Sequence, residues 1–540
     1  MTTMALPDSA GRQAPNQPSV ERNAWDAIPV PELGLWQPSL TVSLVVPYYQ
    51  APDALQVTLA AISEQSYPSE LLEVIVADDG SETPWVPHVG YPMVVRVVRQ
   101  ERQGFGLARA RNLGAKAANG DILVFLDCDM VPDRHHIEAH ARWHHQIDYA
   151  VVFGLRNHVD FRGVGPSEVS KAVREEGLAS LFEGRRVDPV HWIDQHLTRT
   201  DWMRTDTSDP WRVTSGGNLS ISRDFFWDVG GYDETFRQWG GEDNEFGYRT
   251  FANGAVIVPE AMALAWHQGE GHEPEDHERR SLEEQRPKLT NLIPDPTIRR
   301  IRPGRSYEVP VVTVHVRAIT GPKEQTLSVV ESVLSGRFSD LVVLVDMPPE
   351  SPDLVWMERQ FQGDARVRVG SDLDPVAEIP SAHVRVELPT SVLLSMGTLE
   401  DIMGLIWGEQ LGAIHITNPN WDNSRDLIEV YTTRAWTRAK RLDSDAATRS
   451  ALMGRLFGER WISGRTYGFF IANADGLAMS ERYHQAELEL RDQQLRAVTS
   501  RRSVRIADAI GSVVRARSWA DFVGGVKQAW KAVLGKPEAT

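Results

Sequence analysis

The chain of 540 residues is short of cysteine, of long apolar runs and of positive charge. Its one cysteine, Cys128, excludes an intrachain disulfide and is typical of a reducing cytoplasm. No run approaches the roughly 18 apolar residues of a membrane-spanning helix. Residues 1–20 also lack the basic and then apolar pattern of a signal peptide. We therefore expect a cytoplasmic protein whose first segment, residues 1–40, is a disordered or irregular arm.

The low positive charge and the absence of two phosphate-binding motifs count against several classes of function. The net charge of −17 argues against nucleic acid as a partner, although a bound metal could still bring an anionic ligand. Neither a Walker P-loop nor a G-x-G-x-x-G motif follows the first apolar strand, which counts against kinases and dinucleotide-dependent dehydrogenases. The histidines of HHIEAHARWHH (135–145) have no recognised metal spacing, so we expect surface or packing roles for them.

What is present is an alternation of apolar strands and helical patterns. The strand-like runs are TVSLVVPY (41–48), EVIVADDGS (73–81) and ILVFLDCDMV (122–131). This alternation predicts a mostly parallel sheet with crossover helices, whose ligands bind at the carboxyl ends of the strands. The polar clusters lie at those ends: Pro47-Tyr48-Tyr49, Asp78-Asp79 and Asp127-Cys128-Asp129.

The second half repeats part of this pattern. Residues 287–304 contain four prolines and are predicted to be a linker. Beyond it, QTLSVVE (325–331) and LVVLVDM (341–347) resemble VTLAAIS (57–63) and EVIVADD (73–79) at the same offset, although chance similarity between apolar segments is an alternative. Asp79 is replaced by Met347, and VRVELPTSV (384–392) lacks the paired aspartates. We therefore predict that residues 305–480 are a degenerate copy without catalysis.

A helical pattern covers residues 481–540. Between Arg501 and Thr540 it carries eight Lys/Arg against three Asp/Glu, with aromatic residues between them. Such a helix could lie on the inner face of a membrane. The alternatives are packing on the second domain or self-association.

The aspartates of the D-C-D segment suggest a metal site. On a strand, Asp127 and Asp129 would point to one face and Cys128 to the other. Two such carboxylates suit Mg²⁺ or Mn²⁺, which takes further ligands from substrate phosphates. His267 ends another apolar strand and is a third candidate ligand. An acidic turn and a structural histidine are the alternatives.

Three more polar residues fit a nucleotide site. The carboxylates of Asp78 and Asp79 suit a base N–H or ribose hydroxyls better than phosphate, which they would repel. Arg111 could offset phosphate charge or support the base, although arginines on helices are usually solvated.

The segment WGGEDNEFGYR (239–249) suggests a catalytic carboxylate. Gly240 and Gly241 permit backbone turns forbidden to other residues and a close approach to a ligand. Glu242 and Asp243 then fall in the first turn of a helix, whose dipole favours ionised carboxylates. Such a group can accept a proton from a hydroxyl nucleophile. Trp239 could stack on a sugar ring.

These motifs together resemble a known family. VSLVVPYYQ, VIVADDGS, GLARARNLG and FLDCDM are similar to the nucleotide-binding half of family 2 glycosyltransferases, and WGGEDNEFGYR resembles a segment of β-1,4-galactosyltransferases and of bacterial chondroitin-type polymerases. The resemblance covers roughly residues 40–275. It implies a GT-A domain over residues 41–286 with a mixed, mostly parallel sheet, followed by a degenerate GT-A-like domain.

The resemblance also implies roles for single residues. Asp243 would be the catalytic base. The other roles are acceptor binding by Trp239, Gly240, Gly241 and Glu242, metal binding by Asp129, His267 and Asp127, and nucleotide contacts by Pro47, Tyr49, Asp78, Asp79, Arg111 and Asp127.

The expected reaction is an inverting, metal-dependent transfer of one sugar from a nucleoside-diphosphate sugar to a hydroxyl of a carbohydrate or small molecule. We expect the nucleoside diphosphate to be UDP. VRVELPTSV, the counterpart of the D-C-D strand, has no D-x-D, and the second half has no second segment like WGGED. A polymerase with two active sites is therefore disfavoured. The alternatives are a sugar nucleotidyltransferase and a non-catalytic carbohydrate-binding protein.

Overall fold

The fold is known from a computed structural model. It describes residues 17–473 except 89, 176, 188–191, 205–208, 270–275, 301–303, 319–320, 418–427 and 444, together with scattered residues of 480–493. The described residues form two compact units. The first comprises the described parts of Met1–Ile319, Phe338–Pro389 and Asp401–Ser463, and the second those of Thr320–Arg337, Thr390–Glu400 and Gly464–Thr540.

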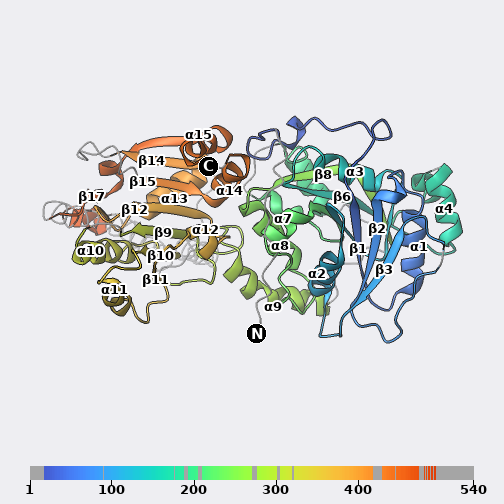
Figure 1. The fold of residues 1–540 in the computed structure, drawn as a ribbon, viewed down its shortest axis with the longest axis horizontal. Helices are drawn as coiled ribbons and strands as arrows, with labels where there is room; N and C mark the ends of the chain where they lie inside the picture. Colours follow the sequence, from blue (N-terminus) through green and yellow to red (C-terminus); the bar gives the residue numbers. More distant parts are fainter. Residues whose placement is uncertain are drawn as a thin grey trace, which may run out of the picture. The chain divides into compact units, whose positions relative to one another are not determined.

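An eight-stranded sheet forms the core of the N-terminal half (Figure 1). Its strands, in spatial order, are β3 (Val94–Arg99), β2 (Leu72–Asp78), β1 (Val42–Tyr48), β4 (Ile122–Leu126), β7 (Asn218–Ser222), β6 (Ala150–Val159), β8 (Val256–Gln268) and β5 (Met130–Pro132). β1 pairs in parallel with β2 and β4, whereas β7 is antiparallel to β4 and β6. The predicted mixed, mostly parallel α/β sheet is therefore confirmed.

The helices of this half are α1 (Pro52–Ile62), α2 (Leu107–Ala117), α3 (His136–His144), α4 (Pro166–Glu175), α5 (Leu178–Leu181), α6 (Trp192–Arg199), α7 (Arg223–Asp228), α8 (Glu242–Ala252) and α9 (Asp276–Leu292). They cover both faces of the sheet. Leu44 and Val46 of β1 pack in the cluster that contains Leu55 and Leu59 of α1, whereas Val45 packs in the cluster that contains Ala108 of α2. Figure 1 shows α1 and α2 on opposite sides of β1 and β2. This is the two-residue period of a strand buried on both faces.

The predicted strand 122–131 is wrong in one respect. It is split into β4 and β5, and Asp127, Cys128 and Asp129 form the turn between them, closed by a hydrogen bond from the amide of Met130 to the carbonyl of Asp127 (3.0 Å). The reason is topological, because β4 lies in the middle of the sheet and β5 at its edge, paired with β8. The two aspartates are therefore placed by a turn and not by the alternation of a strand.

The predicted linker, residues 287–304, begins too early. Residues 287–292 are the end of α9, which contains Pro287. The irregular stretch follows this helix.

A seven-stranded sheet forms the core of the second half. Its order is β11 (Val367–Gly370), β10 (Leu341–Asp346), β9 (Val312–Arg317), β12 (Val384–Pro389), β15 (Ile428–Thr432), β14 (Ala413–Thr417) and β16 (Glu459–Ser463). This order matches β3-β2-β1-β4-β7-β6-β8, and each pair of neighbours runs in the same relative direction in both sheets. A second sheet domain is thus present, and its topology supports the predicted repeat.

The helices of the second half are α10 (Lys323–Leu334), α11 (Leu354–Gln360), α12 (Pro375–Glu378), α13 (Thr398–Glu409), α14 (Thr433–Leu442) and α15 (Ala446–Phe457). Arg438 of α14 is fully buried. Its guanidinium donates to the backbone carbonyls of Val20, Arg22, Gly254 and Ala255. α14 is thereby tied to the loop between α8 and β8.

The second compact unit contains a small sheet of β13 (Val392–Leu394) and β17 (Phe469–Ile471). α10 belongs to the same unit, and its Ser332 hydroxyl accepts a hydrogen bond from the amide of Leu394 (3.1 Å). Residues 501–540, for which a membrane or self-association helix was predicted, lie outside the described residues.

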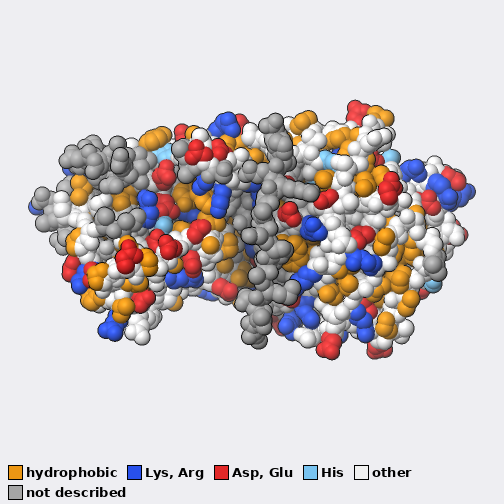
Figure 2. Space-filling view, in the orientation of Figure 1, with side chains coloured by type: hydrophobic (Ala, Val, Ile, Leu, Met, Phe, Trp, Pro, Cys, Tyr) orange, Lys and Arg blue, Asp and Glu red, His pale blue; other side chains and the backbone are white. Residues whose placement is uncertain are grey.

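The charge on the surface and the apolar character of the helices bear on possible partners. On the face drawn in Figure 2, acidic and basic side chains are interspersed. In the part of the chain that the structure describes, no helix has both the length and the apolar character needed to cross a bilayer.

Three buried histidines of α3 fasten it to β7. Two histidine Nε2 atoms, from His136 and His140, contact Asn218 Oδ1 at 2.8 and 2.9 Å. The hydroxyl of Ser220 contacts His140 Nδ1 and His144 Nε2 at 2.9 and 2.8 Å. Burial lowers the pKa of His140 to about 4 and that of His144 to about 3, and it also lowers the pKa of His136. These histidines are packing residues, and they stay neutral in the folded protein.

We expect acid to destabilise the fold through this network. Below about pH 6.5 the histidines of the unfolded chain take up protons that the folded chain refuses, so stability falls as the pH drops towards about 4. Each histidine contributes up to about 1.4 kcal/mol per pH unit. Urea unfolding between about pH 7 and pH 5 should show a smaller slope for His144→Gln than for the wild type. The matched exposed variant His88→Gln should leave the slope unchanged; equal slopes for all three proteins would contradict the assignment.

Candidate active site

A buried arginine joins the two acidic motifs of the first sheet. Arg111 on α2 is fully buried. Its Nη1 donates to Asp243 Oδ1 at 2.9 Å, and its Nη2 donates to Asp127 Oδ1 at 3.2 Å. Burial acts to lower the pKa of the guanidinium, but the carboxylates around it, Asp243 first, raise the pKa above its ordinary value. A residue that could have been a solvated helix arginine therefore holds the D-C-D turn and the start of α8 together.

Two glycines make room for this arrangement. A Cβ atom on Gly216 would lie 2.5 Å from both Arg111 Nη1 and Asp243 Oδ1, and one on Gly217 would lie 2.3 Å from Asp127 Oδ2. Such distances are shorter than packed atoms tolerate. Glycine is required here because the backbone before β7 passes directly against the charged groups.

The start of α8 is shaped by two glycines and carries two acids, Glu242 and Asp243. Gly240 and Gly241 have φ values of +89° and +95°, which side-chain-bearing residues rarely adopt. Glu242 is buried, its Oε1 lies 3.6 Å from Arg111, and its Oε2 has no hydrogen-bond partner among the described residues. Burial and then the neighbouring Asp243 raise the pKa of Glu242. Asp243 keeps 28% of its side chain exposed. The start of α8 is therefore not a solvated helix end, because one of its two acids is buried and both lie near Arg111.

The rest of the segment is structural or exposed. Glu245 and Arg249 form an ion pair one turn apart on α8, and Arg249 also donates to the carbonyl of Gly231. Trp239 is 38% exposed, and its carbonyl accepts a hydrogen bond from the hydroxyl of Ser281 on α9 (2.6 Å). The indole is thus available beside the two glycines.

The structure brings Asp129 and His267 together. His267 Nε2 lies 3.4 Å from Asp129 Oδ2, because β5, which follows the turn, pairs with the end of β8. The ring of His158 on β6 packs against that of His267, with 4.5 Å between centroids. Burial, and then the charge of Asp127, raise the pKa of Asp129 to about 7. This crowding of negative charge is what a bound cation would relieve.

The donor set fits a divalent cation only in part. Among the described residues there is no group of three or more His, Cys, Asp or Glu side chains arranged to hold a metal ion. One carboxylate and one imidazole nitrogen suit Mg²⁺ or Mn²⁺ when phosphate oxygens supply the remaining ligands. Asp127 is shared with Arg111, so a role in metal binding would compete with that contact.

The predicted nucleoside acids are engaged by protein groups. Asp78 is buried and accepts a hydrogen bond from Arg99 Nε at 3.2 Å. Asp79 accepts hydrogen bonds from Arg102 and from the amide of Gly106. The sequence offers no local signal for the two arginines, because charged residues after a strand are usually solvated.

The end of β1 leaves an aromatic ring at the same edge. Pro47 is buried within the strand, whereas Tyr49 just beyond it is 41% exposed. The guanidinium of Arg102 lies over the Tyr49 ring, 3.6 Å from its centroid. The predicted nucleotide-contact residues Pro47, Tyr49, Asp78 and Asp79 thus lie at the ends of the neighbouring strands β1 and β2.

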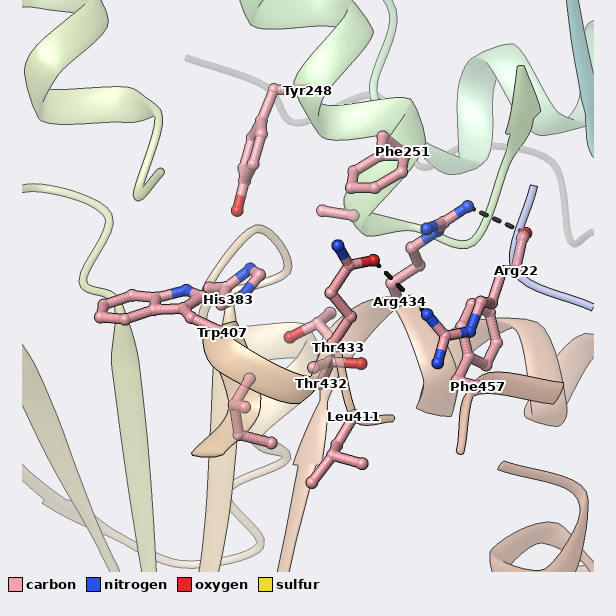
Figure 3. A pocket seen from close by; sticks show the side chains of 13 residues that line it. Arg22, Tyr248, Phe251, His383, Trp407, Leu411, Thr432, Thr433, Arg434 and Phe457 are labelled. Atoms are coloured by element: carbon pink, nitrogen blue, oxygen red, sulfur yellow. Dashed lines mark hydrogen bonds between the residues drawn. The ribbon is translucent and has the colours of Figure 1, made fainter. Parts of the chain in front are cut away.

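A separate cavity of about 90 Å³ lies at the other end of α8 (Figure 3). Tyr248 and Phe251 of α8 line it together with His383 and Trp407, and Arg434 donates to the carbonyl of Arg22 beside it (2.9 Å). None of the acids Asp127, Asp129, Glu242 and Asp243 lines this cavity. It is therefore distinct from the candidate active site.

Two family models match the chain. The model described as glycosyl transferase family 2 matches residues 43–219, and that of the N-terminal domain of galactosyltransferase matches residues 203–262. The first covers β1 to the start of β7, with the D-C-D turn. The second covers Glu242, Asp243 and the first half of β8, and it ends before His267.

Individual proteins are similar over parts of the chain. A chondroitin synthase of Escherichia coli is 26% identical over 417 residues, which cover 72% of this chain and 60% of that protein. A validoxylamine A glucosyltransferase of Streptomyces hygroscopicus subsp. limoneus is 32% identical over 40% of this chain and 49% of its own. The chain thus spans less than two thirds of either relative. A solved mannosyltransferase from Pyrobaculum calidifontis, in complex with GDP-Man and Mn²⁺, has 18% identity and a TM-score of 0.32 over 49% of this chain and 68% of its own.

The family model and the observed sheet agree with the resemblance seen in the motifs. Residues 43–219 are a glycosyl transferase family 2 domain, and the N-terminal half of the chain has the GT-A-like α/β fold.

Proposed function

We propose that the chain is an inverting, metal-dependent glycosyltransferase of the hexosyltransferase type. Its donor is a nucleoside-diphosphate sugar, UDP-linked in our proposal, and its acceptor is a hydroxyl of a carbohydrate or small molecule. The observation that carries the proposal is the double contact of Arg111 with Asp127 and Asp243. This contact holds Asp127, from the proposed nucleotide-binding motif, and Asp243, from the proposed acceptor-binding motif, on the two sides of one guanidinium.

Asp243 is the proposed general base. Arg111 binds one carboxylate oxygen and orients the group, while the exposed part of the side chain can receive the proton of the acceptor hydroxyl. Deprotonation lets the acceptor oxygen attack the anomeric carbon from the face opposite the leaving group. An attack of this kind would invert the configuration at the anomeric carbon.

Glu242 is the proposed acceptor-binding neighbour. Its buried Oε2 has no hydrogen-bond partner among the described residues. Burial, and then the charge of Asp243, raise the pKa of Glu242, which favours its protonated form. The carboxyl group can then bind a second hydroxyl of the acceptor beside Trp239.

Asp129 and His267 are the proposed protein ligands of Mn²⁺ or Mg²⁺, with Asp127 as a third ligand or a ribose contact. Such an ion, when bound, stabilises the negative charge that develops on the departing diphosphate. The ring of His158, which packs against that of His267 at a tilt of 38°, supports the imidazole.

For the nucleoside, the exposed ring of Tyr49 is the proposed contact at the end of β1. The carboxylates of Asp78 and Asp79 already bind Arg99 and Arg102. We therefore propose that these two acids, with Pro47, form the wall of the nucleoside site around Tyr49.

We propose transfer of one sugar and not polymerisation. The Streptomyces relative is named a validoxylamine A glucosyltransferase, whereas the E. coli relative is named a chondroitin synthase. In the second sheet of this chain, His315 and Glu387 stand at the rim where the first sheet has Pro47 and the D-C-D turn. A second transfer site is therefore not proposed there.

A thermal-shift screen of nucleoside diphosphates with Mn²⁺, followed by mass spectrometry of sugar transfer, tests the proposal. Release of a nucleoside diphosphate is expected. Release of pyrophosphate from a nucleoside triphosphate and a sugar 1-phosphate would identify a nucleotidyltransferase, and sugar binding without any transfer would identify a non-catalytic protein.

Asp243→Asn should abolish transfer and leave nucleotide binding nearly unchanged. Loss of a general base costs about 10²–10⁴ in rate, and the amide keeps the shape of the carboxylate. The rate and the nucleotide-induced thermal shift are measured on the same preparation. Asp224→Asn, an exposed acid on α7, is the matched control and should keep full activity. Wild-type turnover by Asp243→Asn would remove this residue from the mechanism.

Metal removal should inactivate the protein reversibly. EDTA should abolish transfer, and Mn²⁺ or Mg²⁺ should restore it. Asp129→Ala and His267→Ala should each raise the metal concentration needed for half-maximal activity, because each removes a ligand. The exposed His88→Ala serves as control. Full activity after exhaustive chelation would exclude the metal assignment.

A further inference from the structure

A line of polar and aromatic side chains crosses one face of the second sheet. His315 of β9 lies opposite Glu387 of β12, and Glu387 lies opposite Glu429 of β15. Glu429 lies opposite His415 of β14, which lies opposite Trp461 of β16. Residues directly opposite each other on neighbouring strands point to the same face. We call these five residues the polar row.

One end of the polar row is locked by internal contacts. Glu387 Oε2 lies 2.8 Å from His315 Nδ1, and Glu387 Oε1 accepts a hydrogen bond from the hydroxyl of Tyr431 (3.0 Å). His315 is 7% exposed, and its Nε2 has no hydrogen-bond partner among the described residues, since Asp346 Oδ2 is 3.6 Å away. A buried polar atom without a partner is uncommon in a folded protein.

The other end of the polar row is open. Trp461 stacks on His415, with 4.4 Å between centroids and 27° between planes, yet it is 57% exposed. His415 Nε2 contacts Glu459 Oε2 at 3.2 Å, whereas its Nδ1 is 3.7 Å from Glu429 and has no hydrogen-bond partner within the described residues. The side chains of Glu429 and Glu459 are 35% and 40% exposed. An exposed indole thus shares one face of the sheet with two carboxylates that can accept hydrogen bonds: Glu459 on its own strand, and Glu429 on the far side of His415.

The charges around the polar row exclude a nucleotide as its natural ligand. The carboxylates of Asp346, Glu387, Glu429 and Glu459 outnumber the cationic groups of Arg317 and His415. A diphosphate would be repelled by this excess. A neutral ligand with many hydroxyl groups meets no such repulsion, since each hydroxyl can donate to a carboxylate.

We propose that the polar row binds a neutral saccharide, with one sugar ring against Trp461 and hydroxyl groups donating to Glu429 and Glu459. Tryptophan combines a large apolar face with a polar edge, which suits the apolar face and polar rim of a sugar ring. The site occupies the rim that corresponds to the nucleotide edge of the first sheet, since β9 and β12 are the counterparts of β1 and β4. Binding here requires neither metal, nucleotide nor sugar transfer.

The test uses the full-length chain in EDTA without nucleotide. Neutral hexasaccharides of α1,4-linked glucose, β1,4-linked glucose and β1,4-linked N-acetylglucosamine are titrated, and binding is followed by saturation-transfer NMR and calorimetry. At least one should bind saturably, and Trp461→Ala should weaken it about tenfold or more. Trp461→Tyr should retain most of the affinity. Glu459→Gln should weaken binding as well, because the amide is a poorer acceptor for hydroxyl donors.

Two controls separate this site from the proposed active site. Val355→Ala removes another exposed apolar side chain, on α11, and should leave saccharide binding unchanged. Asp243→Asn should also leave it unchanged, so a failure of the transfer proposal would not affect this result. The proposal is overturned if none of the three hexasaccharides binds saturably at about 10 mM, or if Trp461→Ala binds as well as the wild type. It is also overturned if UDP with Mn²⁺ binds in a manner that Trp461→Ala abolishes.

Discussion

The arrangement of the candidate active site depends on one buried guanidinium. Arg111 comes from α2, Asp127 from the turn after β4 and Asp243 from the start of α8, so three elements far apart in sequence share one charge. Without that charge, three carboxylates including Glu242 would repel one another in a place with little solvent. The glycines at 216 and 217 are needed for the same reason, because they let the backbone reach this ion cluster.

The sequence predicts the sheet well, because its strands are short apolar runs with clear ends. β1 and β2 were predicted to within a few residues, and Asp127, Asp243 and His267 could all be selected as candidates. The turn at Asp127–Asp129 could not be predicted, because apolar residues continue on both sides of it and only the distant pairing of β5 with β8 breaks the strand. The burial of Arg111 could not be predicted either. A helix pattern shows which residues share a face of the helix, but it does not show what packs against that face.

The two sheets show which features survive when a site changes. Strand order and direction are the same in both, and these depend on apolar residues that face the core. The rim residues differ, with His315 and Glu387 in contact where the first sheet has a proline and a pair of aspartates. Rim side chains are free to change because they contribute little to the core, so one architecture carries two different sets of polar groups.

Arg438 has a consequence for how such a chain can evolve. Its guanidinium, carried by the second half, donates to four backbone carbonyls of the first half. One of these, the carbonyl of Arg22, also accepts a hydrogen bond from Arg434 of the second half. A gene shortened at the linker would lose these donors together with the second sheet. Natural selection on the first half alone would therefore preserve the fold of the second half, even in a lineage where the second half performs no chemistry. Its rim would then be free to acquire a new use by mutation, while its core could not be discarded.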